Sequence, residues 1–271
     1  MRLHAARDPL GTVSGTMAIV ARLNVTPVKS TALHHPDRVR IERWGAVGNR
    51  EFFFLDEEGK LFGGSKLGPL VQIRAEHDVR ADTLRMRFPD GVRVEGPAAG
   101  DGEMLVVNFW GRPVTARVVE GPWAGHVSRY AGRDLRLARV ERPGDGNDIR
   151  PITLVSLASV EELARQGAAD GPLDPARFRM TIELDGLGPH EEDTWAGRRV
   201  RMGGATLLVG DPVPRCVVTT QDPSTGERDF PTLSVIKRYR GVVDGDLLFG
   251  VYASVLEPGD VRVGDGVAPD D

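Results

Sequence analysis

The chain has 271 residues, of which 40% are hydrophobic and 27% charged, with 35 Lys and Arg against 39 Asp and Glu. This composition is typical of a soluble globular protein and argues against disorder and fibrous architectures. Because the charge is nearly balanced, with no basic run and no apolar run of the roughly 20 residues that cross a bilayer, we expect neither nucleic acid as a partner nor an integral membrane segment.

The first half of the chain consists of short apolar runs that Gly and Pro interrupt, a pattern typical of β proteins. The turn signal Pro89-Asp90-Gly91 predicts that Thr83–Phe88 and Val92–Glu95 form a hairpin. A short helix is predicted over Trp123–Ala131. The other predicted strands here are Met17–Val25, Glu51–Leu55, Met104–Trp110, Pro113–Glu120 and Leu135–Glu141.

The segment Arg142–Asp148 is the most loop-like in the chain, because it combines Pro, two Gly and three polar residues. It is predicted to be either a linker or a long connection beside a site. A domain boundary is therefore expected near residues 121–150.

In the second half, the strand Ile152–Ser156 leads into a helix whose N-cap is predicted to be Ser159, because Glu162 would complete a capping box. Thr232–Tyr239 predicts a further helix. The remaining predicted strands are Phe178–Leu184, Arg198–Met202, Ala205–Val209, Cys216–Thr220 and Leu247–Leu256. The predicted fold is mainly β and barrel-like with a few short helices, α+β overall.

The usual signatures of P-loop, Rossmann, zinc-protease and α/β-hydrolase proteins are absent. The six histidines are scattered, which argues against a histidine metal site. Glu191, Glu192 and Asp193 would suit a general base or metal ligands, but a solvated turn beside Pro189 is the favoured interpretation.

The lone cysteine, Cys216, rules out an internal disulfide and favours a reducing compartment. Residues 1–16 lack the apolar core of a secretory signal, Met17 is a candidate start, and we expect a cytoplasmic protein. The guanidinium of Arg215 favours the thiolate of Cys216, which is both a nucleophile and a soft-metal ligand. The residues alone, however, favour a buried and inert cysteine in a strand.

The segment around this cysteine, Pro-Arg-Cys-x-x-Thr-Thr-x-Asp-Pro-x-Thr-Gly over residues 214–226, resembles the signature of MOSC domains, especially of the mitochondrial amidoxime-reducing component and its bacterial relatives. The resemblance covers about residues 17–267. The other segments that resemble this family, in the same order, are Thr26–Ser30, Gly48–Arg50, Phe178–Arg179, Glu192–Trp195 and Leu248–Tyr252.

The resemblance implies a MOSC N-terminal β-barrel domain over residues 17–120 and a MOSC domain over residues 134–267, with the molybdenum cofactor between them. It implies that Cys216 ligates molybdenum and is the catalytic residue. Arginine and lysine suit the phosphate of the pterin, and hydroxyl groups would add donors. The residues that the resemblance assigns to cofactor binding are Lys29, Ser30, Arg50, Ser156, Arg179, Arg215 and Tyr252.

The sequence departs from the family where Phe-Arg-Pro-Asn is replaced by Phe178-Arg179-Met180-Thr181. Thr181 keeps a hydroxyl but lacks the paired donor and acceptor of an amide. The polarity of the pocket, and with it the range of substrates, is open at this point.

The function implied is a molybdenum-dependent oxidoreductase that reduces N-hydroxylated compounds such as hydroxylamines, amidoximes and N-oxides. Its electrons would come from a flavin, haem or iron–sulfur protein, because the chain shows no motif for such a group. The alternative is a non-catalytic carrier of the molybdenum cofactor or of persulfide sulfur on Cys216. Pyridoxal phosphate is not expected, since the chain has no room for a desulfurase domain, and a cysteine hydrolase lacks a recognisable histidine partner.

Overall fold

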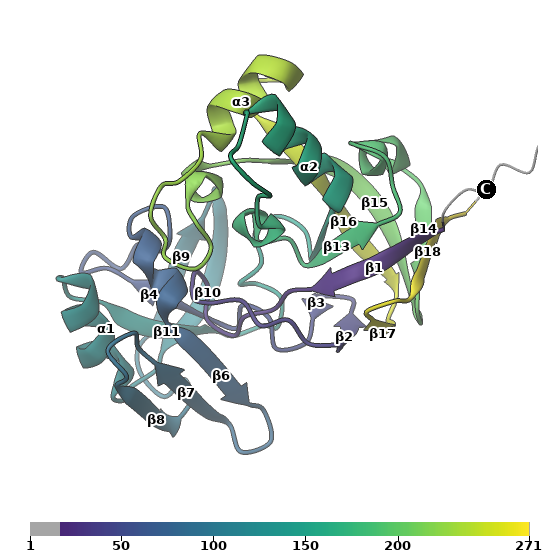
Figure 1. Cartoon of the computed structure of the whole chain (residues 1–271). Helices are drawn as coiled ribbons and strands as arrows, with labels where there is room; N and C mark the ends of the chain where they lie inside the picture. Colours follow the sequence, from purple (N-terminus) through teal and green to yellow (C-terminus); the bar gives the residue numbers. More distant parts are fainter. Residues whose placement is uncertain (1–16, 271) are drawn as a thin grey trace, which may run out of the picture.

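The computed structural model describes residues 17–270, so the expectation about a secretory signal in residues 1–16 lies outside the described residues. The fold is mainly β, as predicted (Figure 1). It contains a closed barrel of seven strands and three smaller sheets, with three α-helices in residues 17–270. No helix in that range is long and apolar enough to cross a membrane.

The barrel forms the C-terminal half of the molecule. In order around the barrel its strands are β1 (Ala18–Leu23), β13 (Ile182–Asp185), β12 (Ile152–Ser156), β16 (Leu248–Glu257), β15 (Ala205–Pro214), β14 (Arg199–Met202) and β18 (Gly266–Pro269). Neighbouring strands are antiparallel except for β12 and β13, which are parallel and connected through α2 (Leu157–Gln166). A parallel pair needs such a crossover, and the helix covers this face of the barrel.

Strand β1 lies between β13 and β18, although it is the first strand in residues 17–270. Ile19 pairs with Asp185 on one side and with Gly266 on the other. A small sheet of β17 (Gly259–Arg262), β2 (Arg38–Glu42) and β3 (Gly45–Ala46) packs beside the barrel. Strands β1, β2 and β3 therefore belong structurally with the second half of the chain.

The N-terminal half consists of two sheets and one helix, α1 (Trp123–Ala131). The larger sheet has the order β5 (Leu61–Phe62), β4 (Phe52–Leu55), β11 (Arg136–Val140), β10 (Arg112–Val118) and β9 (Met104–Phe109). The smaller sheet is β6 (Arg74–Asp78), β7 (Thr83–Arg87) and β8 (Arg93–Pro97). All four residues of β4 are buried, and alternate side chains enter two different apolar clusters, so this strand is central to the half.

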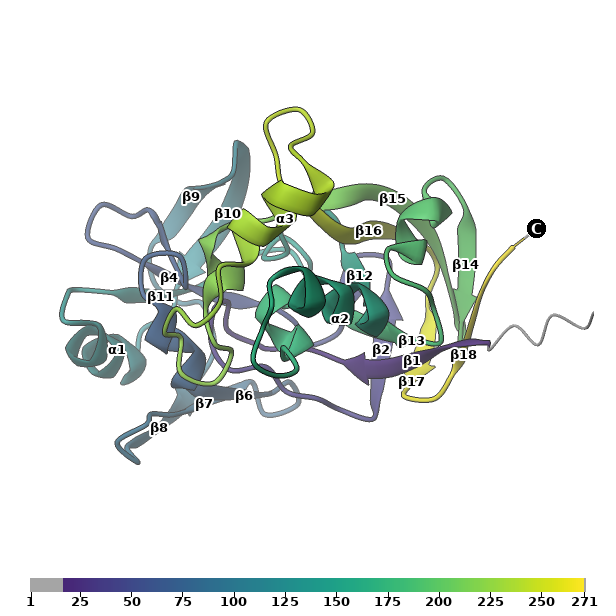
Figure 2. The same ribbon diagram turned by 45° about the horizontal axis from the view of Figure 1, so that its top comes forward.

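Helices α2 and α3 (Thr232–Arg240) lie against each other on the outside of the barrel (Figure 2). Four 3₁₀ segments complete the fold: η1 (Gly68–Gln72), η2 (Pro175–Phe178), η3 (Glu191–Trp195) and η4 (Val217–Thr220). The predicted hairpin and the predicted helices at Trp123–Ala131 and Thr232–Tyr239 are confirmed.

Three predictions of local structure are wrong. Cys216–Thr220 is not a strand, because the hydroxyls of Thr219 and Thr220 donate to the carbonyls of Cys216 and Val217 and stabilise the 3₁₀ turn η4. The strand predicted over Phe178–Leu184 begins only at Ile182, since Arg179 adopts a left-handed conformation. The N-cap of α2 is Ser156 rather than Ser159, because the hydroxyl of Ser156 accepts the amide N–H of Ser159 at 3.0 Å.

Candidate functional site

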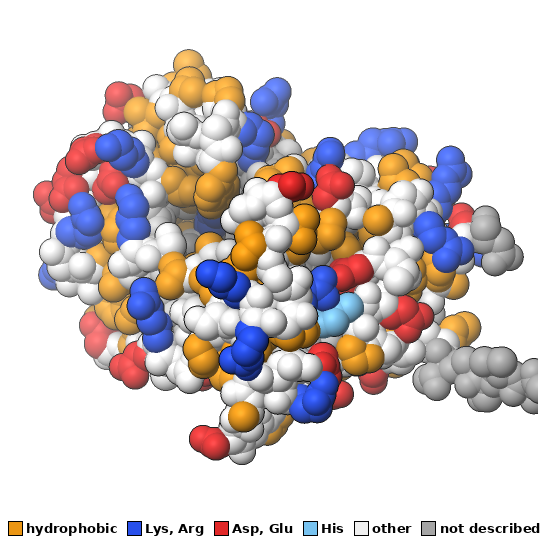
Figure 3. All heavy atoms as spheres, turned by 90° about the horizontal axis from the view of Figure 1, so that it is seen from above, with side chains coloured by type: hydrophobic (Ala, Val, Ile, Leu, Met, Phe, Trp, Pro, Cys, Tyr) orange, Lys and Arg blue, Asp and Glu red, His pale blue; other side chains and the backbone are white. Residues whose placement is uncertain are grey.

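A cavity of about 830 Å³ lies where the two halves of the chain meet. Its walls come from β4–β5 and the β9–β10 turn on one side, and from β12, β15 and β16 on the other. Figure 3 shows the molecule from above, with hydrophobic side chains bordering a hollow and Lys and Arg side chains nearby. Seven of the eight predicted site residues line this cavity: Lys29, Ser30, Arg50, Arg179, Arg215, Cys216 and Tyr252.

Two of the cations share one carboxylate. The ammonium of Lys29 lies 2.6 Å from Asp148 Oδ1, and Arg50 Nη1 lies 3.0 Å from Asp148 Oδ2. The backbone of Lys29 is fixed as well, because its N–H donates to the carbonyl of Phe52 on β4 at 2.8 Å. Asp148 ends the Arg142–Asp148 loop, which is therefore a connection beside the site, as one of its two interpretations predicted.

The other two predicted cations, Arg179 and Arg215, are fixed by backbone carbonyls, which leave their charge uncompensated. Arg179 donates to the carbonyl of Thr31 at 2.7 Å, and Arg50 donates to the carbonyl of Arg179 at 3.1 Å. Arg215 donates twice to the carbonyl of Phe249, at 2.6 and 2.8 Å. The cavity thus concentrates positive charge around a single shared carboxylate.

Burial shifts the pKa values of these groups. Burial lowers the pKa of Lys29 to about 8, against the attraction of Asp148. Burial also lowers the pKa of Arg179 to about 9, with help from the charge of Arg50, and that of Arg215 to about 10. Burial opposes ionisation of Asp148, but the charges of Lys29 and Arg50 outweigh it and hold the pKa of that carboxyl well below its usual range. A bound anion would relieve the cost of crowding these cations.

Backbone strain gathers at the same cavity. Among the described residues, eight that are not glycine have a positive φ, and four of these line the cavity. They are Ser30 (φ 74°), Arg50 (φ 55°), Trp110 (φ 50°) and Arg179 (φ 52°). Such conformations cost free energy and persist where the surrounding structure enforces them, which is common at functional sites.

Cys216 leaves strand β15 in an extended conformation, directly before η4, and its side chain is exposed. The expectation of a buried and inert cysteine is therefore wrong. Burial raises the pKa of the neighbouring Tyr252 to about 12, so its phenol keeps its proton at neutral pH. Tyr252 pairs with Thr153 across β16 and β12, and Thr153 also lines the cavity.

Ser156 is the one predicted site residue that does not line the cavity. It is fully buried, caps α2, and its N–H donates to the carboxylate of Glu192 at 3.2 Å. The Ser159 hydroxyl donates to the same carboxylate at 2.8 Å. Glu192, expected in a solvated turn, is thus buried, and burial raises its pKa despite these hydrogen bonds. The group fixes α2 and η3 to the barrel.

The departure from the family pattern places Met180 in the cavity, not Thr181. The sulfur of Met180 contacts the guanidinium of Arg215. Thr181 is buried behind the wall, and its N–H donates to Thr153 Oγ1 at 2.9 Å. The residue that replaces the family's Asn therefore does not line the cavity, and an apolar side chain, Met180, does.

Sequence reasoning missed two residues of the site, Asp148 and Trp110. The indole of Trp110 lies over the ammonium of Lys29, with the nitrogen 4.8 Å from a ring centroid. The Trp110-Gly111 pair, with positive φ at both residues, forms the tight turn between β9 and β10. Tight turns of this kind normally hold Asn or Asp at the position of Trp110. The aromatic residue before Gly111 was therefore the signal in the sequence that could have identified Trp110.

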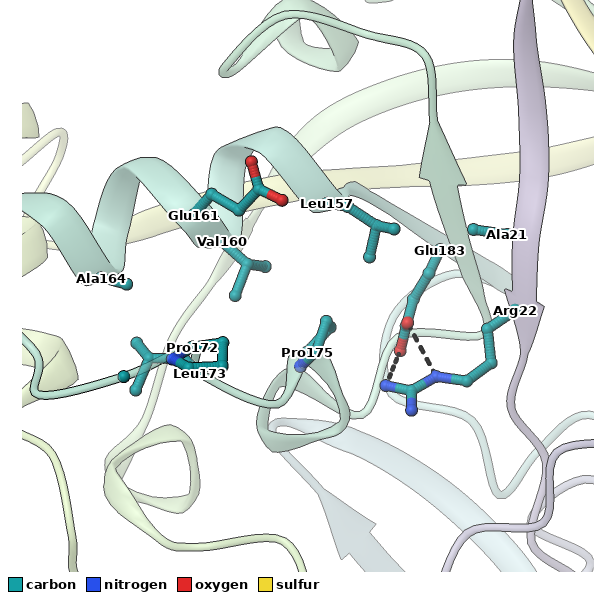
Figure 4. A pocket seen from close by; sticks show the side chains of 11 residues that line it. Ala21, Arg22, Leu157, Val160, Glu161, Ala164, Pro172, Leu173, Pro175 and Glu183 are labelled. Atoms are coloured by element: carbon teal, nitrogen blue, oxygen red, sulfur yellow. Dashed lines mark hydrogen bonds and ion pairs between the residues drawn. The ribbon is translucent and has the colours of Figure 1, made fainter.

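A second cavity, of about 610 Å³, lies between α2 and the edge formed by β1 and β13 (Figure 4). Leu157, Val160 and Pro175 give it apolar walls. The two charged side chains Arg22 and Glu183 neutralise each other, because Arg22 donates to both carboxylate oxygens of Glu183 at 2.8 and 2.9 Å. It contains none of the predicted site residues.

The larger cavity fits a metal that arrives with an organic, anionic cofactor. Within residues 17–270, no group of three His, Cys, Asp or Glu residues is placed to hold a metal ion. A metal bound to the thiolate of Cys216 would need its other ligands from a cofactor, as a dithiolene supplies. Lys29, Arg50, Arg179 and Arg215 would meet the phosphate of such a cofactor.

Comparison with protein families gives two adjacent matches. The model of the MOSC N-terminal beta barrel domain matches residues 17–133, and the MOSC domain model matches residues 141–268. Together the two matches cover almost all the described residues.

Curated relatives fall into two groups. The chain is 28% identical over 255 residues to mitochondrial amidoxime-reducing component 1 of Mus musculus, which covers 83% of this chain and 73% of that protein. It is 32% identical over 251 residues to the molybdenum cofactor sulfurase of Caenorhabditis elegans, covering 90% of this chain and 34% of that protein. Among solved structures, the YuaD protein of Bacillus subtilis is similar with a TM-score of 0.46 at 16% identity, over 93% of this chain and 94% of that one, which is too weak to carry an argument.

Proposed function

The chain belongs to the MOSC family, with a MOSC N-terminal β-barrel domain ahead of a MOSC domain, and from this premise we propose that it is a molybdenum-cofactor oxidoreductase that reduces N-hydroxylated compounds. Its relatives link the chain to the molybdenum cofactor, and one of them is named for the reduction of amidoximes. The proposed division is residues 17–120 and 134–267.

One observation carries the proposal: the only thiol of the chain is exposed and lines the same cavity as four cations fixed by their surroundings. A soft-metal ligand and an anion site are thus combined in one cavity between the two halves. This is the donor set that a phosphate-bearing metal cofactor requires.

The chemistry of each side chain suggests its role in binding the cofactor. The thiolate of Cys216 would hold molybdenum, and Lys29, Arg50, Arg179 and Arg215 would bind the phosphate end of the pterin. The hydroxyl of Ser30 is fixed as an acceptor for the N–H of Gly64 at 3.0 Å, so its own proton stays available to a ligand. The phenol of Tyr252, with a pKa of about 12, stays a donor at the cavity wall.

When bound, the cofactor would supply two-electron chemistry at the N–O bond of the substrate. The balanced reaction takes a hydroxylamine, two electrons and two protons to the amine and water. Met180 makes the wall near Arg215 apolar, which suits the carbon skeleton of the substrate. The electrons would come from a flavin, haem or iron–sulfur partner, and the cytoplasm is the compartment that we propose.

A second function is favoured by the sulfurase relatives together with the exposure of the thiol. In this alternative, Cys216 carries the cofactor or a persulfide for another enzyme, and the protein itself catalyses no reaction. The alignment with the sulfurase covers 34% of that protein, so the activity of the whole sulfurase does not follow for this chain.

The test is to express the protein in a host that makes the molybdenum cofactor and to measure molybdenum and pterin per chain in wild type and Cys216→Ser. We expect near-stoichiometric amounts of both in wild type and loss of molybdenum in the variant, with N-hydroxylated substrates reduced only by wild type. Thr194→Ser is the control, because Thr194 is exposed and does not line the cavity.

Wild type without molybdenum or pterin from a competent host would contradict the reductase and the cofactor carrier, and would leave the persulfide carrier as the function to test. Wild type that holds the cofactor but reduces no N-hydroxylated compound with an artificial electron donor would favour the carrier. A persulfide on Cys216, detected by mass spectrometry, would then identify sulfur as its cargo.

A further inference from the structure

The turn that follows the Cys216 segment meets the N-terminal half backbone to backbone. Gly226, in the turn Asp222–Gly226, lies against Gly68 at the start of η1. A Cβ atom on either glycine would come closer than 3.0 Å to backbone atoms of the other, a separation that real Cβ atoms essentially never show. Only glycine fits at both positions without moving the two halves apart.

Two hydrogen bonds flank this glycine pair. Gln72 Nε2 donates to the carbonyl of Thr225 at 3.2 Å, and Gln221 Nε2 donates to the carbonyl of Gly64 at 2.9 Å. Gln221 is only 7% exposed although it lies between the halves. We call these residues, Gly64, Gly68 and Gln72 with Gln221, Thr225 and Gly226, the interdomain contact.

Both sides of the contact are rigid. In the turn, Asp222 Oδ1 accepts the N–H groups of Ser224 and Thr225 at 2.8 and 2.9 Å. On the other side, the Tyr130 hydroxyl of α1 donates to the carbonyl of Pro69 in η1 at 2.8 Å. The contact therefore joins two ordered segments.

The interdomain contact reaches the cavity through Gly64. The N–H of Gly64 donates to the hydroxyl of Ser30 at 3.0 Å, next to Lys29 in the basic wall. The carbonyl of Gly64 accepts from Gln221, which follows η4 and Cys216 directly in the chain. Gly64 thus connects, through two hydrogen bonds, the segment that follows Cys216 with the segment that carries Lys29 and Ser30.

We propose that the interdomain contact sets the position of the Cys216 thiol relative to Lys29 and Ser30, with Gln221 and Gly226 as positioning residues. This assigns a role to the Asp-Pro-x-Thr-Gly part of the motif, which lies outside the cavity wall. The expected effect of the interdomain contact on cofactor binding rests on the proposed function. Its expected effect on the position of the Cys216 thiol is independent of that function.

The test uses Gly226→Ala in protein prepared without molybdenum. Its matched control is Gly91→Ala, because Gly91 has a φ of 87°, close to the 78° of Gly226, and has no atom within 4 Å of a built Cβ. Both variants carry the same backbone strain, but only Gly226→Ala separates the halves. The readout is the rate at which an aromatic disulfide reagent modifies Cys216 in folded protein.

We expect the rate to rise at least about threefold in Gly226→Ala, because the segment that carries Cys216 is no longer held against the N-terminal half, and to stay at the wild-type value in Gly91→Ala. Gln221→Leu, which keeps the side-chain volume and removes the donor to Gly64, is expected to raise the rate as well. It keeps the proposal testable if Gly226→Ala does not fold, as judged by circular dichroism.

Folded variants that react at the wild-type rate would overturn the inference and leave the proposed function untouched. Conversely, wild type without molybdenum from a competent host would contradict the proposed function and leave this measurement valid, because the thiol reaction needs no cofactor. If both proposals hold, Gln221→Leu also retains less molybdenum than wild type at equal pterin supply.

Discussion

Asp148 places its carboxylate 2.6 Å from the ammonium of Lys29 and 3.0 Å from the guanidinium of Arg50, in a cavity that Arg179 and Arg215 also line. The carboxylate occupies the position relative to these two cations that an anionic ligand would take. We therefore expect Asp148 and a phosphate group to compete for Lys29 and Arg50.

Asp148→Asn is expected to strengthen binding of inorganic pyrophosphate to metal-free protein by about tenfold, since one charge-assisted hydrogen bond is worth about 1.5 kcal/mol. Isothermal titration calorimetry measures the affinity. Asp246→Asn is the control, because Asp246 lines the cavity but shows no ion pair with Lys29 or Arg50, and a smaller gain is expected. Weaker binding in Asp148→Asn would mean that the carboxylate orients the cations for the ligand.

The affinity for pyrophosphate is also expected to depend on pH through Lys29, whose pKa is about 8. As the pH rises through that value, Lys29 loses its proton and its attraction for the anion, so the affinity falls. Lys29→Arg stays charged and should move the fall to higher pH. A titration series from about pH 6.5 to 9.5 measures this, and an identical fall in both proteins would show that another group titrates.

Ser156→Ala tests the assignment of Ser156 to the cap of α2. Loss of a buried cap costs about 1–2 kcal/mol of unfolding free energy, while the cofactor content should not change. Chemical denaturation and pterin analysis measure the two quantities. Ser65, which is exposed in the cavity, gives the matched control Ser65→Ala with little loss of stability. Pterin loss without loss of stability would restore Ser156 to the cofactor site.

His77, whose side chain is buried, joins segments of the N-terminal half through an ion pair network with partly exposed partners. Its ring lies 3.1 Å from Glu51 and 3.0 Å from Asp82, and Arg139 faces both carboxylates. Burial opposes the charged form, but the two carboxylates outweigh it and raise the pKa of His77 above 6.5. The folded protein therefore binds this proton more tightly than the unfolded chain does.

The stability from His77 is thus present in full below about pH 6.5 and is lost as the pH rises through the raised pKa. We expect the Tm to fall over that range in wild type, and His77→Gln to lack this component. Thermal melts between about pH 5.5 and 8.5 measure it. His126→Gln is the control, because within the described part of the chain the ring of His126 makes a hydrogen bond only with the carbonyl of Pro122. Parallel curves for wild type and His77→Gln would contradict the assignment.

Elements whose signals are local were predicted well from the sequence. The Pro89-Asp90-Gly91 turn forms as expected, with the N–H of Phe88 donating to the carbonyl of Val92 at 2.9 Å. The segment after Cys216 was mistaken for a strand because Val and Thr favour strands. There the two threonine hydroxyls bond back to the chain, and the carbonyl of Thr219 accepts the hydroxyl of Thr232, a partner that local patterns do not reveal.

The site was predictable only as far as the family motifs reach. They found the thiol and the four cations, but Asp148 follows a loop whose composition does not indicate which cation it meets. Ser156 was assigned to the cofactor because it occupies a family position, whereas its burial against Glu192 depends on residues far along the chain. Contacts of this kind arise from topology rather than from sequence periodicity.

The place of β1 in the barrel has a consequence for the order of events during synthesis. Among the described strands, the ribosome makes β1 first, whereas its neighbour β13 is made late and β18 last. Until then β1 has two open edges, which are sites for mispairing with other chains. All strands of the N-terminal sheets are thus made before the barrel can close, which requires that β18 has been translated.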